Sequence, residues 1–309
     1  MVRKIATIGL VVSMLLAVSF VGSWYSQKQD DSLNMIKPMA GAEKPGFENA
    51  RSLPLPEHLE FAGEDVPLED EDVRERLDRE LHINTYWHTN TILMIKRANR
   101  WLPAIAEELK KDSIPDDFKY IVAIETNFKN DTSPRGAVGF WQFVKDAAVE
   151  KGLEVNSEVD ERYDPVKSTR AAADYLKHAY EKFGSWTMAA ASYNRGVTGM
   201  VNAIEHQNER DYYRLMLNEE TSRYVFRILA AKMVLENPEK YGYDVQPQHL
   251  YVPFKTYSVD VTETIPNLVE WSIEHNITFR QLKRYNPWIQ SDQLTVKNGK
   301  VYKIQLPNK

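Results

Sequence analysis

The sequence has no cysteine among its 309 residues. This absence excludes a disulfide framework, a thiolate metal site, a catalytic cysteine and attachment of a lipid through cysteine. The chain also lacks a strong basic bias, because its formal net charge is -5 at pH 7 and residues of both signs are interspersed. It therefore offers no basic surface for nucleic acid, which is not an expected partner.

Metal-binding patterns are scarce as well. His82 and His88 flank the stretch INTYW, but at this spacing they do not share a helical face well, and no carboxylate lies at ligand spacing. No arrangement of Ser, His and Asp stands out for nucleophilic catalysis. We therefore expect a protein without a metal and without a cofactor.

One long apolar run lies near the N-terminus, where Arg3 and Lys4 precede an uncharged segment. Residues 5–22 would span roughly 27 Å as a helix, the lower limit for crossing a membrane. Basic residues followed by an apolar run are typical of export signals, which predicts an exported protein of the cell envelope or periplasm. Two alternatives stay open for residues 1–24: an uncleaved membrane anchor, or a signal peptide that is removed.

The rest of the chain divides into three parts. Residues 25–72 are rich in Pro, Gly, Glu and Asp without an apolar period, which predicts a flexible linker. Residues 73–245 carry helical patterns with start and stop signals and predict an all-α domain. Inside it, an apolar stripe over residues 172–183, ended by Gly184, predicts a packing helix. Residues 246–309 predict a small module with the order strand, helix, helix, strand.

An acidic residue interrupts one of the helical patterns. Phe118, Ile121, Val122 and Glu125 recur at i, i+3, i+4 and i+7, so the carboxyl group of Glu125 points inward. Burial among apolar neighbours raises the pKa of a carboxyl group, which then keeps a proton to donate near neutral pH. A general acid for a glycosidic oxygen needs this property, although pairing with an Arg or a backbone amide is an equally good explanation from spacing alone.

Four separated blocks in the helical domain carry a family resemblance: ETNF…SPRGAVGFWQF, DERYDPVKSTRAAADYL, AAASYNRG and EETSRYVFRILA. In this order they resemble the lytic transglycosylases with a goose-type lysozyme-like (SLT) catalytic domain, most closely the membrane-bound D-type kind that carries LysM modules. The resemblance implies a mainly α, lysozyme-like catalytic domain followed by a βααβ LysM-like module. It also implies an enzyme that cleaves the β-1,4 bond between MurNAc and GlcNAc in peptidoglycan strands without water, leaving 1,6-anhydro-MurNAc ends.

Carried over by position, the resemblance makes Glu125 the catalytic acid and then the catalytic base. Substrate binding falls on a further set: Thr126, Gln142, Tyr193, Asn194, Glu220 and Tyr224. Thr126 replaces the usual Ser of the family and keeps its hydroxyl group, whereas Asn130 takes the place of a usual Pro. Taken alone, Tyr193 also suits a core position, and Glu220 suits the first turn of a helix as a plain charge.

Two other functions stay open. One is a hydrolytic muramidase on the same fold, in which Asp131 or Asp164 would position water. The other is a catalytically dead peptidoglycan-binding protein. In the C-terminal module, residues 282–287 match the LysM pattern Leu-x-x-x-Asn-Pro, but VTETIP replaces the usual Gly-Asp-Thr. The module is therefore either a glycan-binding unit or a structural cap on the catalytic domain.

Overall fold

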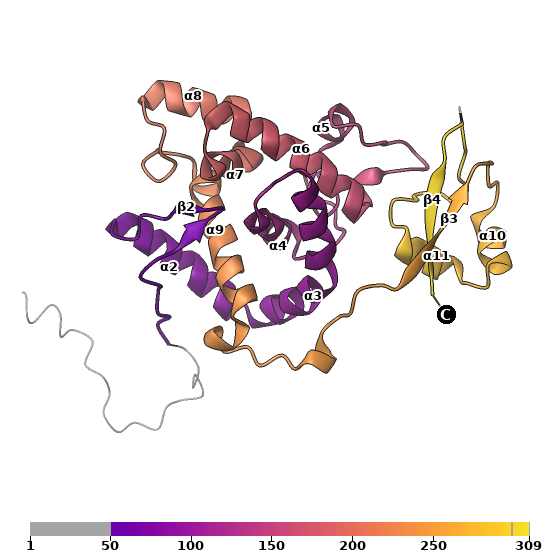
Figure 1. Cartoon of the computed structure of the whole chain (residues 1–309), viewed down its shortest axis with the longest axis horizontal. Helices are drawn as coiled ribbons and strands as arrows, with labels where there is room; N and C mark the ends of the chain where they lie inside the picture. The colour runs from indigo at the N-terminus through magenta and orange to yellow at the C-terminus, as the bar shows by residue number, and fades with distance from the viewer. Residues whose placement is uncertain (1–50, 298, 309) are drawn as a thin grey trace, which may run out of the picture. The chain divides into compact units, whose positions relative to one another are not determined.

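The computed structural model describes residues 51–297 and 299–308. Most of this part of the chain is helical, and two small antiparallel sheets accompany the helices (Figure 1). The fold class expected from the sequence is confirmed: a helical domain is followed by a small module with two strands. The N-terminal apolar run and its two alternatives lie outside the described residues. Among the residues that are described, no helix is both long and apolar enough to cross a membrane.

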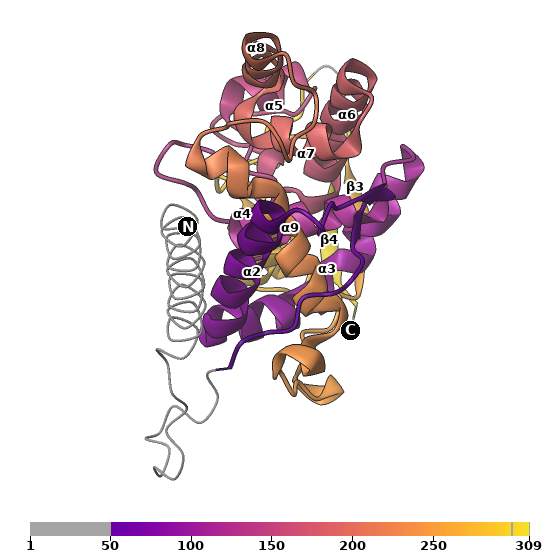
Figure 2. The ribbon, with the colours of Figure 1, turned by 90° about the vertical axis from the view of Figure 1, so that its left-hand side faces the viewer.

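Long helices build the domain around one apolar core. They are α2 (Glu71–Tyr86), α3 (His88–Lys111), α6 (Pro165–Phe183), α7 (Trp186–Arg195), α8 (Val197–Gln207) and α9 (Glu219–Glu236). The shorter pieces are η1 (Asp116–Tyr120), α4 (Ile121–Thr126), α5 (Lys145–Glu150), η2 (Glu161–Tyr163), η3 (Pro238–Tyr241) and η4 (Pro247–His249). Helix α9 packs against α2, α4 and α7, and Figures 1 and 2 both show it beside α2. The core therefore surrounds α9.

Helix α6 shows how the sequence specifies this packing. Ala172, Leu176 and Ala179 of the predicted stripe are fully buried, as expected for one face of an amphipathic helix. Asp164 caps the first turn by accepting hydrogen bonds from backbone N–H groups, and Pro165 suits the first helical position. The helix ends at Gly184 with a left-handed φ of 67°, the conformation predicted for this glycine.

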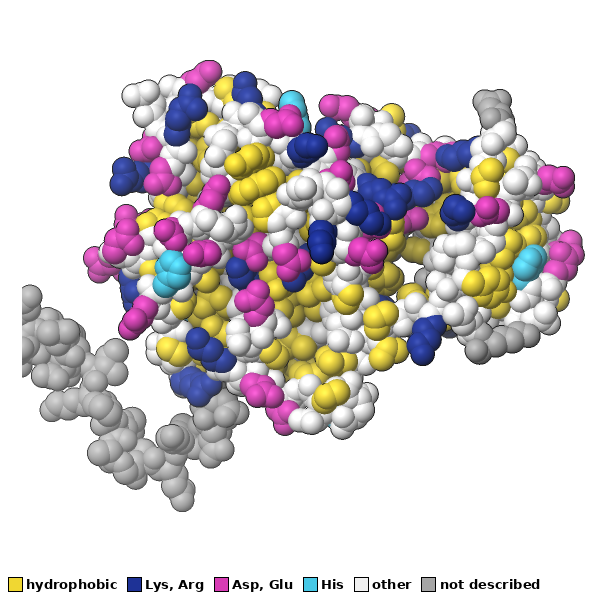
Figure 3. All heavy atoms as spheres, in the orientation of Figure 1, with side chains coloured by type: hydrophobic (Ala, Val, Ile, Leu, Met, Phe, Trp, Pro, Cys, Tyr) yellow, Lys and Arg dark blue, Asp and Glu magenta, His cyan; other side chains and the backbone are white. Residues whose placement is uncertain are grey.

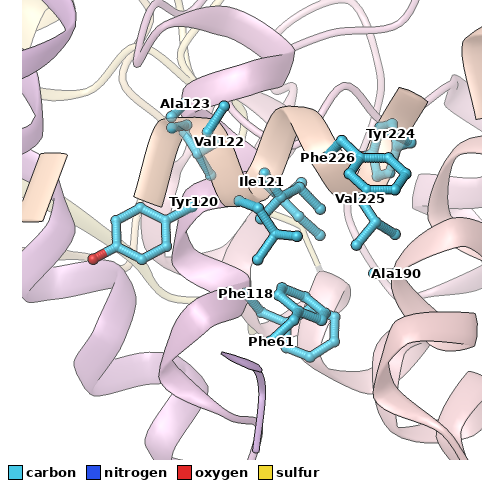
Figure 4. Close-up of a cluster of buried hydrophobic side chains, with 14 of the residues drawn as sticks. Phe61, Phe118, Tyr120, Ile121, Val122, Ala123, Ala190, Tyr224, Val225 and Phe226 are labelled. Carbon is cyan, nitrogen blue, oxygen red and sulfur yellow. The ribbon is translucent and has the colours of Figure 1, made fainter. Parts of the chain in front are cut away.

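The prediction of a flexible linker over residues 25–72 was wrong for residues 52–72. Leu53, Phe61, Val66 and Leu68 are buried in the core of the helical domain. Strands β1 (Glu60–Phe61) and β2 (Glu64–Asp65) form a short hairpin there. The ring of Phe61 lies 5.2 Å from that of Phe118, and Figure 4 shows the two side by side. Single apolar residues separated by prolines have no period, and burial against distant helices gives them a structure that local pattern cannot reveal. The remainder of the predicted linker lies outside the described residues.

The carboxylate of Glu64 in β2 caps a helix far along the chain. It accepts hydrogen bonds from the backbone N–H groups of Trp186 and Thr187, and from the hydroxyl groups of Ser185 and Thr187. A negative charge at a helix N-terminus is favourable because it meets unpaired N–H groups and the positive end of the helix dipole. The N-terminal hairpin therefore supports α7.

The C-terminal module has the predicted order of elements. Strand β3 (Thr256–Val261) is followed by α10 (Leu268–Glu274), α11 (Phe279–Tyr285) and β4 (Tyr302–Pro307). The two strands are antiparallel, with Thr256 opposite Pro307 and Val261 opposite Tyr302. Asn267 caps α10, and Thr278 with Gln281 forms a capping box at α11. The prediction of a βααβ unit is confirmed.

The module shares a contact region with the helical domain. Val159 of that domain pairs with Ile289 as an antiparallel bridge, and its side chain is buried in the apolar cluster of the module. The carboxylate of Glu158 accepts hydrogen bonds from the backbone N–H and the hydroxyl group of Thr295 at 2.7 and 3.0 Å. These contacts agree with the alternative in which the module caps the domain, and they leave glycan binding by the module as a prediction.

A test of this contact uses the pH dependence of stability. The N–H of Thr295 lowers the pKa of Glu158 below its ordinary value. A carboxyl group whose pKa is lower in the folded state stabilises the fold above its unfolded pKa, and this stabilisation is lost as pH falls through the folded pKa. We expect Glu158→Gln to lower the melting temperature at neutral pH and to have no effect in acid. A difference that persists unchanged into acid would contradict the assignment of this carboxylate.

Charged side chains of both signs are interspersed over the face of the molecule shown in Figure 3. Nucleic-acid binding usually requires a large patch of positive charge. The visible surface therefore has the mixed charge that the composition predicts.

Candidate active site

Glu125 lies in the last turn of the short helix α4, which follows η1 directly. Phe118, Ile121 and Val122 of the predicted face are fully buried, whereas Glu125 is partly exposed. The helix ends because Asn127 and Phe128 both have left-handed φ angles, 53° and 54°. This abrupt end leaves the carboxyl group of Glu125 between the apolar core and open space.

Helix α9 supplies the polar partners of Glu125. The hydroxyl group of Tyr224 donates a hydrogen bond to Oε1 of Glu125 at 2.6 Å. Arg227, one turn further along, donates to the backbone carbonyl of Ile124 at 2.7 Å. Because Tyr224 is buried and faces Glu125, its own pKa is raised well above the usual value, and the phenol keeps its proton. Tyr224 is therefore a fixed donor to Glu125.

Burial is the main influence on the acidity of Glu125. It raises the pKa of the carboxyl group, in the direction that the sequence predicted, and the negative charge of Glu220 acts in the same direction. The hydrogen bond from Tyr224 and the positive charge of Arg227 act the other way. A carboxyl group under these opposing influences can hold a proton, lose it to a substrate and recover it.

The carboxyl group of Glu125 opens into a cavity of about 600 Å³. One wall is the loop that follows α4, whose lining residues are Ser133, Pro134, Arg135, Ala137, Gln142, Phe143 and Val144. The loop is folded back on itself by bridges from Val138 to Thr132 and to Phe143. Gly139 is required where it stands, because a Cβ atom there would lie 2.0 Å from the carbonyl oxygen of Arg162.

The structure brings most of the predicted site residues together. Gln142, Tyr193, Asn194 and Glu220 line the same cavity as Glu125. Asn194 donates a hydrogen bond to Oε1 of Glu220 at 3.2 Å and accepts one from Thr221 at 2.7 Å. Tyr193 donates to the carbonyl group of Trp141 at 2.8 Å, which ties α7 to the cavity loop. Residues from three segments that are distant in sequence therefore surround one carboxyl group.

Comparison with known families agrees with this geometry. Residues 103–216 match the family described as "Transglycosylase SLT domain". The chain carries an SLT domain. Residues 257–309 match the "Soluble lytic transglycosylase C-terminal LysM-like domain". The family resemblance read from the sequence blocks is confirmed at the level of these two domains. Glu220 and Tyr224 lie beyond the matched part of the SLT domain, but Glu220 lines the cavity and Tyr224 donates a hydrogen bond to Glu125.

The chain is also similar to individual curated proteins. It is 30% identical over 191 residues to "Membrane-bound lytic murein transglycosylase D" of Escherichia coli strain K12 and equally to that of strain O6:H1. These alignments cover 59% of this chain and 41% of each relative, so the chain matches about two fifths of their length. A "Putative tributyltin chloride resistance protein" of Alteromonas sp. strain M-1 is 30% identical over 112 residues, covering 36% of this chain and 54% of the relative.

Two predicted site residues do not line the cavity: Tyr224, which reaches it only through its hydrogen bond to Glu125, and Thr126. The side chain of Thr126 is buried, and its hydroxyl group lies 3.3 Å from the carbonyl oxygen of Val122 and 3.4 Å from that of Phe140. Consecutive residues of an α-helix point about 100° apart, so the residue after Glu125 faces a different side of α4. Thr126 therefore contacts the cavity loop from behind instead of lining the cavity.

The carboxylates considered for a hydrolytic mechanism have other partners in the SLT domain. Asp164 accepts hydrogen bonds from the N–H groups of Val166 and Lys167 at the start of α6. Asp131 is exposed and pairs with Lys129 at 2.8 Å. Neither lines the cavity of Glu125, whereas Glu220 does.

Two residues that line the cavity, Tyr175 and Arg135, were not predicted as site residues. Tyr175 was interpreted as packing on α6, yet it also lines the cavity and donates to the carbonyl group of Ser192 at 2.7 Å. Arg135 lies in the quoted SPRG stretch and reaches the cavity, but a single exposed arginine gives no sequence signal. The tryptophans 101, 141 and 186 pack in or against the core.

Histidines 82 and 88 remain poor candidates for a metal site. His82 contacts Asp78 through Nδ1 and accepts a hydrogen bond from the N–H of Leu53 through Nε2. The ring of His88 packs against Tyr86 and Tyr243. Both rings are used in local packing and hydrogen bonding, which agrees with the sequence-based expectation but does not test it.

Proposed function

We propose that this protein is a peptidoglycan lytic transglycosylase that cleaves the β-1,4 bond between MurNAc and GlcNAc and leaves 1,6-anhydro-MurNAc ends. The observation that carries the proposal is the pairing of Glu125 with the Tyr224 hydroxyl group at the edge of the cavity. The match to the SLT domain and the name of the relatives from Escherichia coli support the substrate class. No cofactor takes part in the proposed reaction.

The proposed reaction uses Glu125 twice. Its raised pKa keeps a proton that it donates to the glycosidic oxygen as the bond to C1 of MurNAc breaks. The carboxylate formed is stabilised by the Tyr224 hydroxyl group, and it then removes the proton from the C6 hydroxyl group of the same sugar. That oxygen closes onto C1. Because nucleophile and electrophile belong to one sugar, the second step is intramolecular, and no water enters the product.

Glu220 supports a second candidate function. It lines the same cavity, and an amide N–H of Asn194 donates to it. Inverting glycosidases use a second carboxylate to activate water. In a hydrolytic muramidase Glu220, not Asp131 or Asp164, would have this task.

One product analysis distinguishes these candidates. Purified peptidoglycan is digested with the full chain in ¹⁸O-labelled water, and the products are examined by mass spectrometry. Lytic transglycosylation gives unlabelled 1,6-anhydro-MurNAc ends. Reducing MurNAc ends that carry ¹⁸O would establish a hydrolase instead, and retained glycan binding without any product would establish a binding protein.

The proposed location follows from the substrate. Peptidoglycan strands lie outside the cytoplasmic membrane, and the basic-then-apolar N-terminal pattern is typical of export. The protein therefore acts in the cell envelope, in the periplasm or attached to the membrane by residues 5–22. Fractionation of cells that express the full chain tests this, since recovery in the cytosolic fraction would contradict it.

Tyr224→Phe tests the role of the hydroxyl group beside Glu125. The lost hydrogen bond favoured the ionised carboxylate, so its removal is expected to raise the pKa of Glu125 further. The protonated acid then persists to higher pH, and the alkaline limb of the pH profile of kcat/KM moves upward. Tyr257→Phe, on an exposed part of β3, is the matched control. An alkaline limb that stays in place would assign it to another group.

A further inference from the structure

A short segment of the SLT domain lies between the cavity loop and the C-terminal module. We call residues 158–163 the docking segment and residues 131–144 the cavity loop. The docking segment contains the 3₁₀ turn η2 and three charged side chains that are almost completely buried, Asp160, Glu161 and Arg162. Buried charges are costly unless they are paired, so their partners show what the segment holds.

Toward the active site, Arg162 holds the cavity loop. Its guanidinium group donates to both carboxylate oxygens of Asp160, at 2.9 and 2.7 Å. The remaining terminal nitrogen donates to the carbonyl group of Phe143 at 3.1 Å and approaches that of Gly136 at 3.4 Å. The planar fork of an arginine can make these bonds together, which the single ammonium group of a lysine cannot reproduce.

Two further contacts tie the same surfaces together. Asn130, just before the cavity loop, donates to the carbonyl group of Tyr163 at 2.9 Å, and the hydroxyl group of Tyr163 lies 2.9 Å from that of Thr132. The backbones also touch at Gly139, where no side chain fits against the carbonyl oxygen of Arg162. The cavity loop therefore takes much of its position from the docking segment.

Toward the module, the docking segment behaves as an added strand. The N–H of Asp160 donates to the carbonyl group of Trp288 at 2.8 Å, and the N–H of Gln290 donates to that of Glu158 at 2.7 Å. Between these bonds, Val159 is 1% exposed and belongs to the apolar cluster of the module. Asp160 therefore bonds to Trp288 of the module through its backbone N–H and to Arg162 through its side-chain carboxylate.

We infer that Arg162 is a positioning residue through which the docked module fixes the cavity loop around Glu125. The inference rests on the proposed function, and it gives the module a part in the catalytic rate besides any glycan binding. The physical reason is an unbroken chain of hydrogen bonds. The module bonds to the backbone of Asp160, the side chain of Asp160 bonds to Arg162, and Arg162 bonds to the carbonyl group of Phe143, which lines the cavity. Loss of the contact at one end leaves the loop at the other end less constrained.

Val159→Asp in the full chain tests the coupling. It places a charge in the apolar cluster of the module and should undock it without changing the interior of the SLT domain. With a soluble glycan tetrasaccharide as substrate, we expect kcat to fall by about two- to thirtyfold, the range that distant positions produce when they modulate coupling. Val269→Asp, the same change at an exposed position of α10, should leave kcat unaltered. Val159→Ala provides a milder variant if Val159→Asp folds poorly.

Amide hydrogen exchange gives a second readout that needs no activity. The N–H groups of Ser133, Val138 and Gly139 are bonded within the cavity loop, to Ala137, Phe143 and Asp131. Their protection should fall in Val159→Asp, whereas the amides of α6 should keep theirs. Arg162→Gln should give the same loss in the loop, and Arg162→Lys a smaller one, because a lysine keeps the charge beside Asp160.

Unchanged kcat on the soluble substrate together with unchanged exchange in the cavity loop would overturn the inference, and would restrict the module to capture of the cell wall. If Val159→Asp raised only the KM on intact sacculi and left kcat on the soluble substrate unchanged, the module would likewise be restricted to capture of the cell wall. If the wild-type chain forms no lytic product, the proposed function fails, but loop exchange still decides whether the module and the cavity loop are coupled.

Discussion

Glu125→Gln is expected to lower turnover by at least about a hundredfold, since a positioned acid contributes on the order of a hundred- to ten-thousand-fold. The amide matches the carboxyl group in shape but can neither donate the proton to the glycosidic oxygen nor remove one from C6. The variant should still bind glycan, because Gln142, Tyr193 and Asn194 remain at the cavity. Its melting temperature should not fall, since a neutral amide carries no charge that burial would penalise. Initial rates on purified peptidoglycan and sedimentation with sacculi measure the two effects.

The control for this variant is Glu150→Gln on α5, where the same chemical change falls on an exposed side chain. It should leave turnover unaltered. Glu220→Gln adds a comparison inside the cavity: a loss as large as that of Glu125→Gln would favour the hydrolytic mechanism, in which two carboxylates are needed. Full turnover by Glu125→Gln would remove this residue from the chemistry altogether.

Phe61→Ala is expected to destabilise the protein by about 3–5 kcal/mol, the usual loss when a fully buried phenylalanine is truncated. The ring of Phe61 is 0% exposed and packs against Phe118, which begins the face that carries Glu125 (Figure 4). The missing ring would leave a cavity that the surrounding helices cannot fully close. Urea unfolding followed by circular dichroism measures the loss as a lower midpoint at constant slope.

Glu57→Ala is the control for this prediction, because Glu57 lies in the same N-terminal segment but is exposed. Its effect should stay within about 0.5 kcal/mol, as for most surface substitutions. Equal midpoints for Phe61→Ala and the wild type would show that residues 52–72 do not pack on the helices in solution. A truncated chain that starts at Val73 would lose Leu53, Phe61 and Val66 together and should not reach the stability of the longer one.

The parts of the fold that were predictable are those with local periodicity. The stripe with Ala172 and Leu176 specified α6, and Gly184 specified its end. Two strand patterns on either side of two short helical patterns specified the βααβ order of the module. The N-terminal hairpin was not predictable, because Phe61 and Val66 gain their burial from helices that come much later in the sequence. Local pattern carries no information about such contacts.

In the candidate site, too, local spacing predicted some features, whereas contacts between distant residues could not be predicted from it. The spacing that includes Phe118 and Ile121 predicted that Glu125 points inward, and the structure agrees. Tyr224 is 99 positions away, and only the family resemblance indicated it. Thr126 was assigned to substrate binding by position in a motif, but helix geometry turns its hydroxyl group toward the backbone of the cavity loop. A motif identifies which residues belong to a site, whereas the geometry of the helix α4 that carries Glu125 and Thr126 determines which side chain faces the cavity.

The cap that Glu64 provides for α7 has a consequence for the order of folding. Chains are synthesised from the N-terminus, and Thr187 follows Glu64 by 123 positions. A two-stranded hairpin is at best marginally stable alone, so β1 and β2 should form no lasting structure while the ribosome is still producing the helices. The first described strands to be made are thus among the last to fold. Until α7 is present, the carboxylate of Glu64 lacks the N–H and hydroxyl groups that hold the hairpin to the helical domain.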